Sequence, residues 1–523
     1  MVKQLFLLLN TIRYLKRVQC FYQIKYRLLP KQAVSPSAEN FSICAGIQFD
    51  YFIHGKRKYL GNSTFQFLNL TKQFYRQIDW NFMEFGKLWN YNLEYFDLLT
   101  QEHISNEEKK RLIYDFYEFS IVNKRTLEAY PVSLRVINII KFTIENGLYK
   151  ERYLEYVLKE LTFLSNRYEF HILGNHLLEN GFAMCLGSAF FKESQWHNKA
   201  LKLLNEELEE QILPDGAHFE LSPMYHNIIF YRLLELIDWY SSYKNKDAKF
   251  VSFLNEKAAK MRSWLEQIQF TNGDIPLFND AANGIAYSNI ELLKYADRLH
   301  IASAGLPLSE SGYRSYKGAN YEVKVDFAQI GAFYQPGHAH ADALSFILYY
   351  NNEPLFVEQG TSTYNIGERR NLERSTEAHN TVVCCNRNQS TVWGGFRVGK
   401  RALTTITGDA STEIQAYHSG YKSFGVRHTR TYQFFRKGVE ITDDLEDGAG
   451  VFYLHLHPDA GDITLDSKEL IVINQNKVQV VLLSEAEVKT EVYQFAESYN
   501  IYRSSKRIVI HFKKALTVKF NFL

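Results

Sequence analysis

The sequence lacks an excess of either charge, and it has few cysteines. Its 60 lysine and arginine residues nearly balance 58 aspartate and glutamate residues, so the formal net charge is +2. This balance argues against a protein dedicated to binding nucleic acid, because such proteins usually carry a strong basic excess. Five cysteines are too few for a disulfide scaffold. We therefore expect reduced thiols in a cytoplasmic protein, with a periplasmic location as the alternative.

Long apolar runs are also missing. Outside the N-terminus, no stretch approaches the ~20 apolar residues that a membrane-spanning helix needs. The N-terminus, MVKQLFLLLNTIRYLKRVQC, begins with a short apolar run that Asn10 interrupts, and Arg13, Lys16 and Arg17 follow. No small-residue cleavage site comes after it, so a signal peptide is not indicated. The pattern predicts a basic amphipathic helix that packs on the body or makes a peripheral contact with an anionic membrane surface.

The chain is long, and it is rich in aromatic residues. With 523 residues it is expected to form two or three domains around a large core. Aromatic residues make up 15% of it, including 35 tyrosines and 38 phenylalanines. Most of these should fill the core, while a few tyrosines or tryptophans would line a cleft as platforms for sugar rings.

Helical periodicity dominates the first half of the chain. Leu154, Val157, Leu158 and Leu161 follow the i, i+3, i+4, i+7 spacing of an amphipathic helix. The same pattern recurs at 201–212 and 253–268, and loops with Gly, Pro, Asn and Asp separate the repeats. Several such helices predict a helical array or toroid over residues 85–312, after an irregular lead-in at 1–84 that contains the basic helix.

The pattern changes to strands after about residue 315. Segments rich in β-branched and aromatic residues alternate with turns, and they read YEVKVDF, LSFILYY, TRTYQFF, VEITDDL, KVQVVLL and RIVIHF. They predict an antiparallel β-sandwich over residues 313–523. The expected fold class is therefore α+β multidomain, with a toroid followed by a sandwich.

Two polar clusters lie in the helical half. GNHLLENG at 174–181 holds Asn175, His176 and Glu179, and its alternative interpretation is a helix start with Asn175 as the cap. DGAHFELSPMYH at 215–226 surrounds a loop-to-helix junction, where Ser222 would cap and Pro223 would occupy the first turn. Its chemically active residues would be His218, Glu220, Tyr225 and His226, or else Tyr and His are incidental there.

A third cluster is GHAHAD at 337–342, which precedes the apolar segment ALSFILYY. On a β-strand, alternate residues share a face, which would place His338, His340 and Asp342 together. Buried polar side chains need partners, because unpaired polar groups are costly inside a protein. The partners would be a metal, a substrate or other protein groups.

The fourth cluster is a long polar stretch at 356–383, and loops of this length are usually functional. It contains Glu358, Tyr364, Arg369, Arg370, Arg374, His379 and Asn380. His340, Glu358 and His379 would form a His–carboxylate–His set compatible with zinc. A further His-x-His, in YLHLHP at 453–458, has few polar neighbours, so we interpret His455 and His457 as the solvent side of a strand.

These four clusters, in this order, resemble the heparinase II/III-like polysaccharide lyases. GHAHADALSF and RSTEAHNTV carry the resemblance most specifically, and WNYNLEYFDLL at 89–99 and YPVSLRVINIIKF at 130–142 look like the first toroid helices. The resemblance implies an incomplete (α/α) toroid joined to an antiparallel β-sandwich. It also implies cleavage of an acidic polysaccharide or oligosaccharide by β-elimination at a uronic acid.

The resemblance assigns roles within the clusters. Asn175, with His176 beside it, would stabilise charge on the uronate carboxylate. Tyr225 and His338 would transfer protons, although tyrosine acts as a base only where positive charge favours the phenolate, and Arg374 is a candidate for that charge. The substrate-binding residues implied are Arg135, Glu179, Glu220, Tyr364 and Arg374.

A structural zinc ion or another divalent metal is implied at His340, Glu358 and His379. The family commonly has Asp at the position of Glu358, and Asp342 could be a substitute ligand. Because His338 would face the cleft and His340 the metal, we expect a local twist or bulge in GHAHAD.

Three functions remain open from the sequence. The first is an active lyase, with a role in bacterial capsule or surface-polysaccharide metabolism. The second is a catalytically inactive glycan-binding or polysaccharide-assembly factor on the same fold. A zinc hydrolase is the weakest alternative, because no general-base carboxylate stands at metalloprotease spacing.

Overall fold

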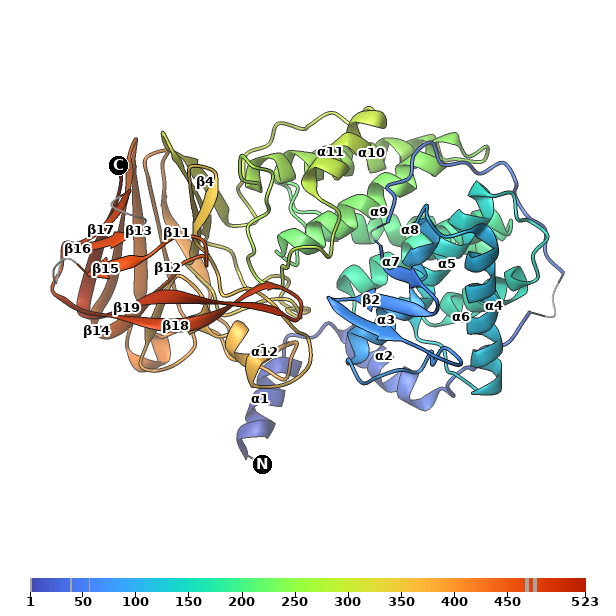
Figure 1. Ribbon diagram of the computed structural model, residues 1–523, viewed down its shortest axis with the longest axis horizontal. Helices are drawn as coiled ribbons and strands as arrows, with labels where there is room; N and C mark the ends of the chain where they lie inside the picture. Colours follow the sequence, from blue (N-terminus) through green and yellow to red (C-terminus); the bar gives the residue numbers. More distant parts are fainter. Residues whose placement is uncertain (1, 38–39, 56, 466–469, 474–476) are drawn as a thin grey trace.

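The computed structural model describes residues 2–37, 40–55, 57–465, 470–473 and 477–523. The chain divides into a helical part and a β part that lie side by side (Figure 1). The predicted order of toroid and sandwich is thus confirmed, and the first strand of the β part begins at residue 313. Among the described residues, no helix is both long and apolar enough to cross a membrane.

The lead-in contains two helices and a small sheet. α1 (Val2–Ile12) and α2 (Arg17–Leu28) come first, followed by the strands β1 (Tyr59–Gly61), β2 (Thr64–Phe67) and β3 (Leu70–Gln73). The turn between β2 and β3 reaches the β part, because Asn69 donates a hydrogen bond to the Tyr499 carbonyl at 2.9 Å. The lead-in therefore connects the two halves instead of hanging free.

The helical part consists of nine helices of the described chain, several of them with side-chain caps. They are α3 (Lys87–Glu94), α4 (Asn106–Val122), α5 (Ala129–Glu145), α6 (Tyr153–Asn166), α7 (Gly174–Phe190), α8 (Ser194–Gln211), α9 (Pro223–Ser242), α10 (Ala248–Ile268) and α11 (Asn289–Arg298). Ser105, Ser222, Asp247 and Ser288 accept backbone N–H groups at the starts of α4, α9, α10 and α11. α5, α7 and α9 are buried along most of their length and form the interior.

The β part packs a small antiparallel sheet against a large one. The small sheet contains β4 (Tyr313–Lys317), β5 (Tyr321–Asp326), β6 (Phe346–Tyr350) and β7 (Glu353–Phe356). The large sheet follows the order β11 (Thr404–Asp409), β12 (Glu413–His418), β13 (His428–Phe435), β14 (Gly438–His455), β19 (Ile501–Phe522), β17 (Val478–Leu482), β16 (Leu470–Ile473) and β15 (Ile463–Leu465). Phe346 and Phe356 of the small sheet meet Phe520 of the large one, so apolar faces of both sheets share one core.

The remaining elements connect these layers. β18 (Ala486–Ser498) pairs with β19, and β8 (Val382–Cys384) pairs with β14. β9 (Val392–Trp393) and β10 (Arg397–Val398) form a separate hairpin, and α12 (Glu368–Glu373) interrupts the long stretch between β7 and β8.

GHAHAD lies on a loop between β5 and β6, so the prediction that it is part of a β-strand is wrong. A turn at residues 337–338 stands where a twist or bulge in a strand was expected. This loop faces the helical part, since the Asp280 amide donates to the His338 carbonyl at 3.0 Å. Asn279 completes the junction by accepting the His340 amide at 2.8 Å. The candidate site therefore forms where the two halves meet.

Candidate functional site at the domain junction

Tyr225 and His338 stack on each other at this junction. Tyr225 lies in the first turn of α9, and its amide donates to the capping hydroxyl of Ser222 at 3.3 Å. Its ring lies 3.8 Å from the imidazole of His338, centroid to centroid, with an interplanar angle of 27°. The hydroxyl groups of Tyr225 and Tyr364 are 3.2 Å apart. Two residues expected to transfer protons and one expected to bind substrate therefore come together.

Asn175 joins this group through Glu220. The backbone amide of Asn175 lies 2.8 Å from Glu220 Oε1, and its side-chain nitrogen lies 3.0 and 2.9 Å from the two carboxylate oxygens. The other side of the same carboxylate faces His338, with Oε2 3.7 Å from Nε2. Asn175 is not a helix cap, because the N-cap position of α7 is Leu173. Glu220 is buried and orients Asn175, so its described contacts are with protein groups of the site, and its expected role in substrate binding stays a prediction.

Asp280 is the residue of the site that sequence reasoning missed. His338 Nδ1 lies 3.0 Å from one of its oxygens, and His340 Nε2 lies 2.8 Å from the other. The guanidinium of Arg370 binds both oxygens, with Nη2 at 2.6 Å from Oδ2. Burial alone would raise the pKa of Asp280, but Arg370, His338 and His340 together hold it well below its usual range. Asp280 ends the segment TNGDIPLFND at 271–280, one of the Gly-, Pro-, Asn- and Asp-containing loops of the helical half, and no local pattern marks it there.

Burial also controls the state of Tyr225. It raises the pKa of the Tyr225 hydroxyl well above its usual value, and Tyr499 adds to the effect. The expected source of positive charge, Arg374, does not contact the tyrosine. Its guanidinium donates to the backbone carbonyls of Ala339 and Gly395. Tyr225 is therefore a neutral phenol here, and Arg374 holds loops together instead of binding substrate.

Two other residues expected to bind substrate are ion-paired inside the toroid. Arg135 on α5 is 1% exposed and binds Glu160 on α6, with Nη2 at 2.6 Å from Oε1. Glu179 on α7 is also buried, and Arg232 Nε lies 3.1 Å from its Oε2. Both assignments are wrong for the same physical reason. A charge on an inner helix of a toroid is buried, and a buried charge requires a counter-ion.

His176 and the remaining histidines of this region have separate surroundings. His176 lies against the ring of Tyr130 with centroids 4.2 Å apart, and its Nδ1 is 3.2 Å from Glu169. Burial opposes its protonation, but Glu169 raises its pKa. His218 and His226 are buried, and burial lowers their pKa values to about 4 and about 3. Both are structural residues, in line with the alternative interpretation that the histidines of that cluster are incidental.

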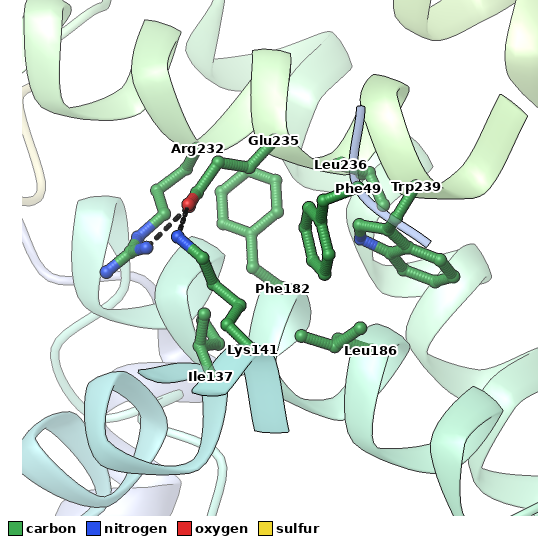
Figure 2. A pocket seen from close by; sticks show the side chains of 9 residues that line it. All are labelled: Phe49, Ile137, Lys141, Phe182, Leu186, Arg232, Glu235, Leu236 and Trp239. Atoms are coloured by element: carbon green, nitrogen blue, oxygen red, sulfur yellow. Dashed lines mark hydrogen bonds and ion pairs between the residues drawn. The ribbon is translucent and has the colours of Figure 1, made fainter. Parts of the chain in front are cut away.

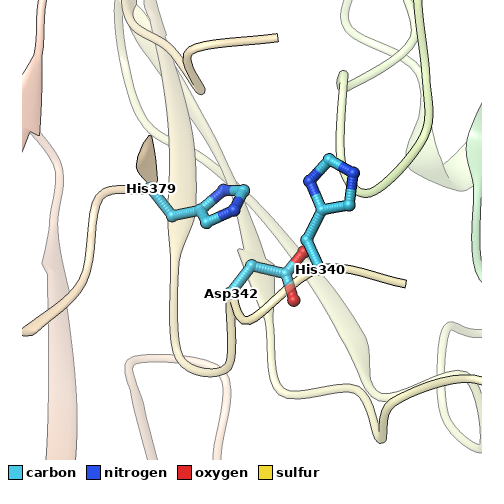
Figure 3. A group of neighbouring side chains, drawn as sticks. All are labelled: His340, Asp342 and His379. Carbon is cyan, nitrogen blue, oxygen red and sulfur yellow. The ribbon is translucent and has the colours of Figure 1, made fainter. Parts of the chain in front are cut away.

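A second group of side chains consists of His340, Asp342 and His379 (Figure 3). All three are buried, and one ligand atom of each lies within 4.8 Å of the other two. His340 Nδ1, His379 Nε2 and Asp342 Oδ2 are buried atoms without a hydrogen-bond partner among the described residues. Such a set of unpaired nitrogen and oxygen atoms fits a divalent cation such as zinc.

Glu358, expected as a ligand, lies next to this group of three, and its Oε1 is also a buried atom without a hydrogen-bond partner among the described residues. Its Oε2 binds Nδ1 of His379, just as Asp280 binds Nε2 of His340. Each histidine thus has one nitrogen on a carboxylate and the other directed to the group, an arrangement typical of metal-binding histidines. Burial lowers the pKa of His340 to about 3 and raises that of Asp342 to about 6. Asp342 therefore places a carboxylate next to the two histidines, while Glu358 supports His379.

His455 also differs from its expected position. It is fully buried, its Nδ1 lies 3.2 Å from the Asn380 side chain, and its ring packs against Tyr493. The loop after β7 covers this end of β14, since the Val357 amide donates to the His455 carbonyl at 3.0 Å. The interpretation of the His-x-His pair as a solvent-exposed face is wrong for His455, while His457 is partly exposed.

A pocket inside the toroid is separate from this site (Figure 2). Phe49, Phe182 and Trp239 form its apolar wall, and Lys141, Arg232 and Glu235 form its polar side. Its charges are satisfied internally, because Glu235 accepts both Arg232, at 2.6 Å, and Lys141. Its large side chains and internal ion pairs leave little room for a ligand. We therefore place the candidate active site at the domain junction.

Solved structures define the class of fold. Heparinase III is similar over 97% of this chain and 91% of that chain, with a TM-score of 0.66 and 17% identity. The heparan sulfate lyase HepC from Pedobacter heparinus is similar over 88% of this chain and 81% of that chain, with a TM-score of 0.59 and 17% identity. At this level of identity the likeness establishes the toroid–sandwich architecture.

Sequence comparison then establishes the family. The models described as Heparinase II/III N-terminus and Heparinase II/III-like, C-terminal, match residues 120–299 and 302–523, so the chain belongs to the heparinase II/III family. It is 27% identical over 269 residues to a heparin-sulfate lyase of Bacteroides stercoris, a match that covers 44% of this chain and 39% of that protein. A heparin-sulfate lyase of Pedobacter heparinus is 26% identical over 247 residues, covering 41% and 36%. The match thus spans about two fifths of the length of these curated relatives.

Proposed function

We propose that the protein is a polysaccharide lyase that cleaves a uronic-acid-containing acidic glycan by β-elimination. The observation that carries this proposal is the stacking of Tyr225 on His338 beside the Glu220-bound amide of Asn175. The family membership and the similarity to heparin-sulfate lyases support it. A role in bacterial capsule or surface-polysaccharide metabolism stays a prediction from the sequence.

The hydrogen bonds suggest which residue acts as the base and which acts as the acid in the reaction. Asp280 occupies Nδ1 of His338, so Nε2 carries the free lone pair and serves as the base that removes the C5 proton. The neutral phenol of Tyr225 then serves as the acid that protonates the leaving glycosidic oxygen. The C5–H and C4–O bonds break, and a C4–C5 double bond forms.

Asn175 would stabilise the charge that develops as the proton leaves. An amide nitrogen has two N–H groups, so Glu220 can orient one of them while the other faces the uronate carboxylate. A donor fixed in advance stabilises the transition state because it does not have to reorganise during the reaction. Tyr364, next to the Tyr225 hydroxyl, completes the polar surface available to the sugar.

We further propose that His340, Asp342 and His379 hold one structural divalent cation, with zinc as the first candidate. The three unpaired buried atoms support this proposal, and so do the carboxylates on the outer nitrogen of each histidine. A bound cation would keep the loops that carry His338 and His379 in place by cross-linking them.

A panel of uronic-acid-containing glycans tests the main proposal. Cleavage by β-elimination creates an unsaturated uronate, whose ultraviolet absorbance should rise with the wild-type protein and not with Tyr225→Phe. Glycan binding without any such absorbance would instead favour the alternative of an inactive glycan-binding or assembly factor. Reducing-end release without absorbance would identify a hydrolase and overturn the proposal.

A further inference from the structure

One side of the first two helices, α1 and α2, contacts the helical part and the β part. At the end of α1, Thr11 accepts a hydrogen bond from Trp393 Nε1 of the β9–β10 hairpin at 3.2 Å. On α2, Gln19 donates to the carbonyls of Ile172 and Tyr334, both at 3.2 Å. Figure 1 shows α1 extending away from the body, with the N-terminus at its tip. The opposite sides of both helices therefore face outward.

These outer sides are apolar. On α2, Phe21, Ile24 and Leu28 are spaced i, i+3, i+7 and are 60%, 63% and 80% exposed. On α1, Leu5 and Leu9 are 57% and 58% exposed. Residues at this spacing lie on one face of a helix, so each helix presents a continuous apolar stripe. Exposed apolar surface of this extent normally marks an interaction site.

The same segment is strongly basic. Residues 1–38 contain seven lysines and arginines and no aspartate or glutamate, although the whole chain has a net charge of only +2. At about 100° per residue, Lys25 and Arg27 flank the Phe21–Leu28 stripe on its two sides, and Arg17 lies at its N-terminal end. All three side chains are exposed. The partner of this face must therefore combine an apolar interior with negative charges at its surface.

We propose that the outer face of α1 and α2 docks on the surface of an anionic lipid bilayer. An apolar stripe of Phe, Leu and Ile bordered by Lys and Arg is the composition of helices that lie in the membrane interface. Negatively charged headgroups complement the flanking basic residues, while the stripe enters the headgroup–acyl boundary. A helix with such a stripe along one side lies parallel to the bilayer surface, so the proposed contact is peripheral. It holds the enzyme at a membrane surface while the domain junction acts on glycan.

Vesicle flotation of the full-length protein tests this proposal. The protein should float with vesicles of phosphatidylcholine and phosphatidylglycerol, and it should not float with vesicles of phosphatidylcholine alone. Added salt should weaken the binding, because it screens exposed charges. The triple variant Arg17→Gln/Lys25→Gln/Arg27→Gln should bind the anionic vesicles roughly 100-fold more weakly, since each basic residue contributes about a factor of five at such a surface.

A second variant and a control separate the contributions. Phe21→Ser/Ile24→Ser/Leu28→Ser should also lose binding, whereas Leu483→Ser/Val492→Ser, which changes exposed apolar residues of the sandwich, should bind like wild type. Equal melting temperatures would show that all variants are folded. Flotation that both triple variants retain would overturn the proposal, as would failure of the wild type to float. It would also be overturned if the apolar variant only converted a vesicle-independent dimer into monomers, because the face would then be an interface between two copies.

Discussion

His338 and His340 lie two residues apart and bind the same carboxylate, but they belong to different surroundings. Each has one ring nitrogen on Asp280, at 3.0 and 2.8 Å. The second nitrogen of His338 faces Glu220, beside the stacked ring of Tyr225. The second nitrogen of His340 is buried without a partner, close to Asp342 and His379. The two histidines therefore differ in the groups that surround the ring nitrogen not bound to Asp280, and their neighbours in the sequence do not reveal this difference.

Among variants of the group around His338, Tyr225→Phe should have the largest effect on lyase activity. The variant removes only a hydroxyl, whose described contact is the hydroxyl of Tyr364, so stability should hardly change. Lyase activity should fall by ~10²–10⁴-fold, the usual contribution of a proton-transfer group. The absorbance assay and a thermal melt measure the two effects, with exposed Tyr75→Phe as the control. Wild-type turnover by Tyr225→Phe would remove this residue from the mechanism.

Asp280→Asn should lower both the stability of the protein and its lyase activity, because Asp280 binds His338 and His340. It leaves buried Arg370 without its counter-ion, which typically costs about 3–5 kcal/mol of the free energy of unfolding. It also frees the ring of His338, so activity should fall even in the folded protein. A urea titration and the lyase assay check these outcomes.

The sandwich offers a matched control in Asp443, a buried carboxylate that also binds a histidine and an arginine. His428 Nε2 lies at 2.6 Å and Arg430 Nε at 2.7 Å from its Oδ1. Asp443→Asn should destabilise the protein to a similar degree while the folded fraction stays active. If both variants lost activity equally when folded, Asp280 would have no special role at the site.

The metal side is tested by comparing Asp342 with Glu358. Asp342→Asn and His340→Ala should abolish binding of one zinc equivalent and lower the melting temperature, because ligation stabilises the native state. Glu358→Gln should retain the metal but bind it ~10–100-fold more weakly, as expected for a residue that only supports a ligand. His338→Ala should keep the metal and lose activity. Elemental analysis of these variants decides the assignment, and full metal content in Asp342→Asn would contradict it.

The smallest expected effect is a pH dependence of stability at Asp443 in the sandwich. Burial opposes ionisation of Asp443, but Arg430 and His428 lower its pKa to about 2. A carboxyl group with a depressed pKa stabilises the folded state above its unfolded pKa of about 4 and loses this contribution as the pH falls through about 2. The stability difference between wild type and Asp443→Asn should therefore shrink by roughly 2 kcal/mol between these pH values. Urea titrations across this range measure the difference, and a constant value would contradict the account.

The sequence by itself determined the division of the chain into a helical and a β part, and it pointed to several residues that meet at the domain junction. Helical spacing at 154–161 and strand composition at 344–350 depend on local backbone geometry; the first segment is helical and the second is a strand from Phe346 to Tyr350. Ser222 and Pro223 likewise begin α9 as expected, which fixes the position of Tyr225. Local periodicity and capping are sufficient for such features, because the residues that form them are close in the chain.

Only the tertiary structure decided the partners of the buried charges. Asp280 comes from a loop without any distinctive pattern, yet packing of the two halves brings it to His338, His340 and Arg370. Arg135 and Arg374 were expected at the substrate, but both are buried and satisfied within the protein. Folding likewise places Asp342 in the buried group of three with His340 and His379, while Glu358 contacts His379 from outside that group. The free energy of a buried charge depends on groups brought close by folding, and their distance along the chain does not reveal them.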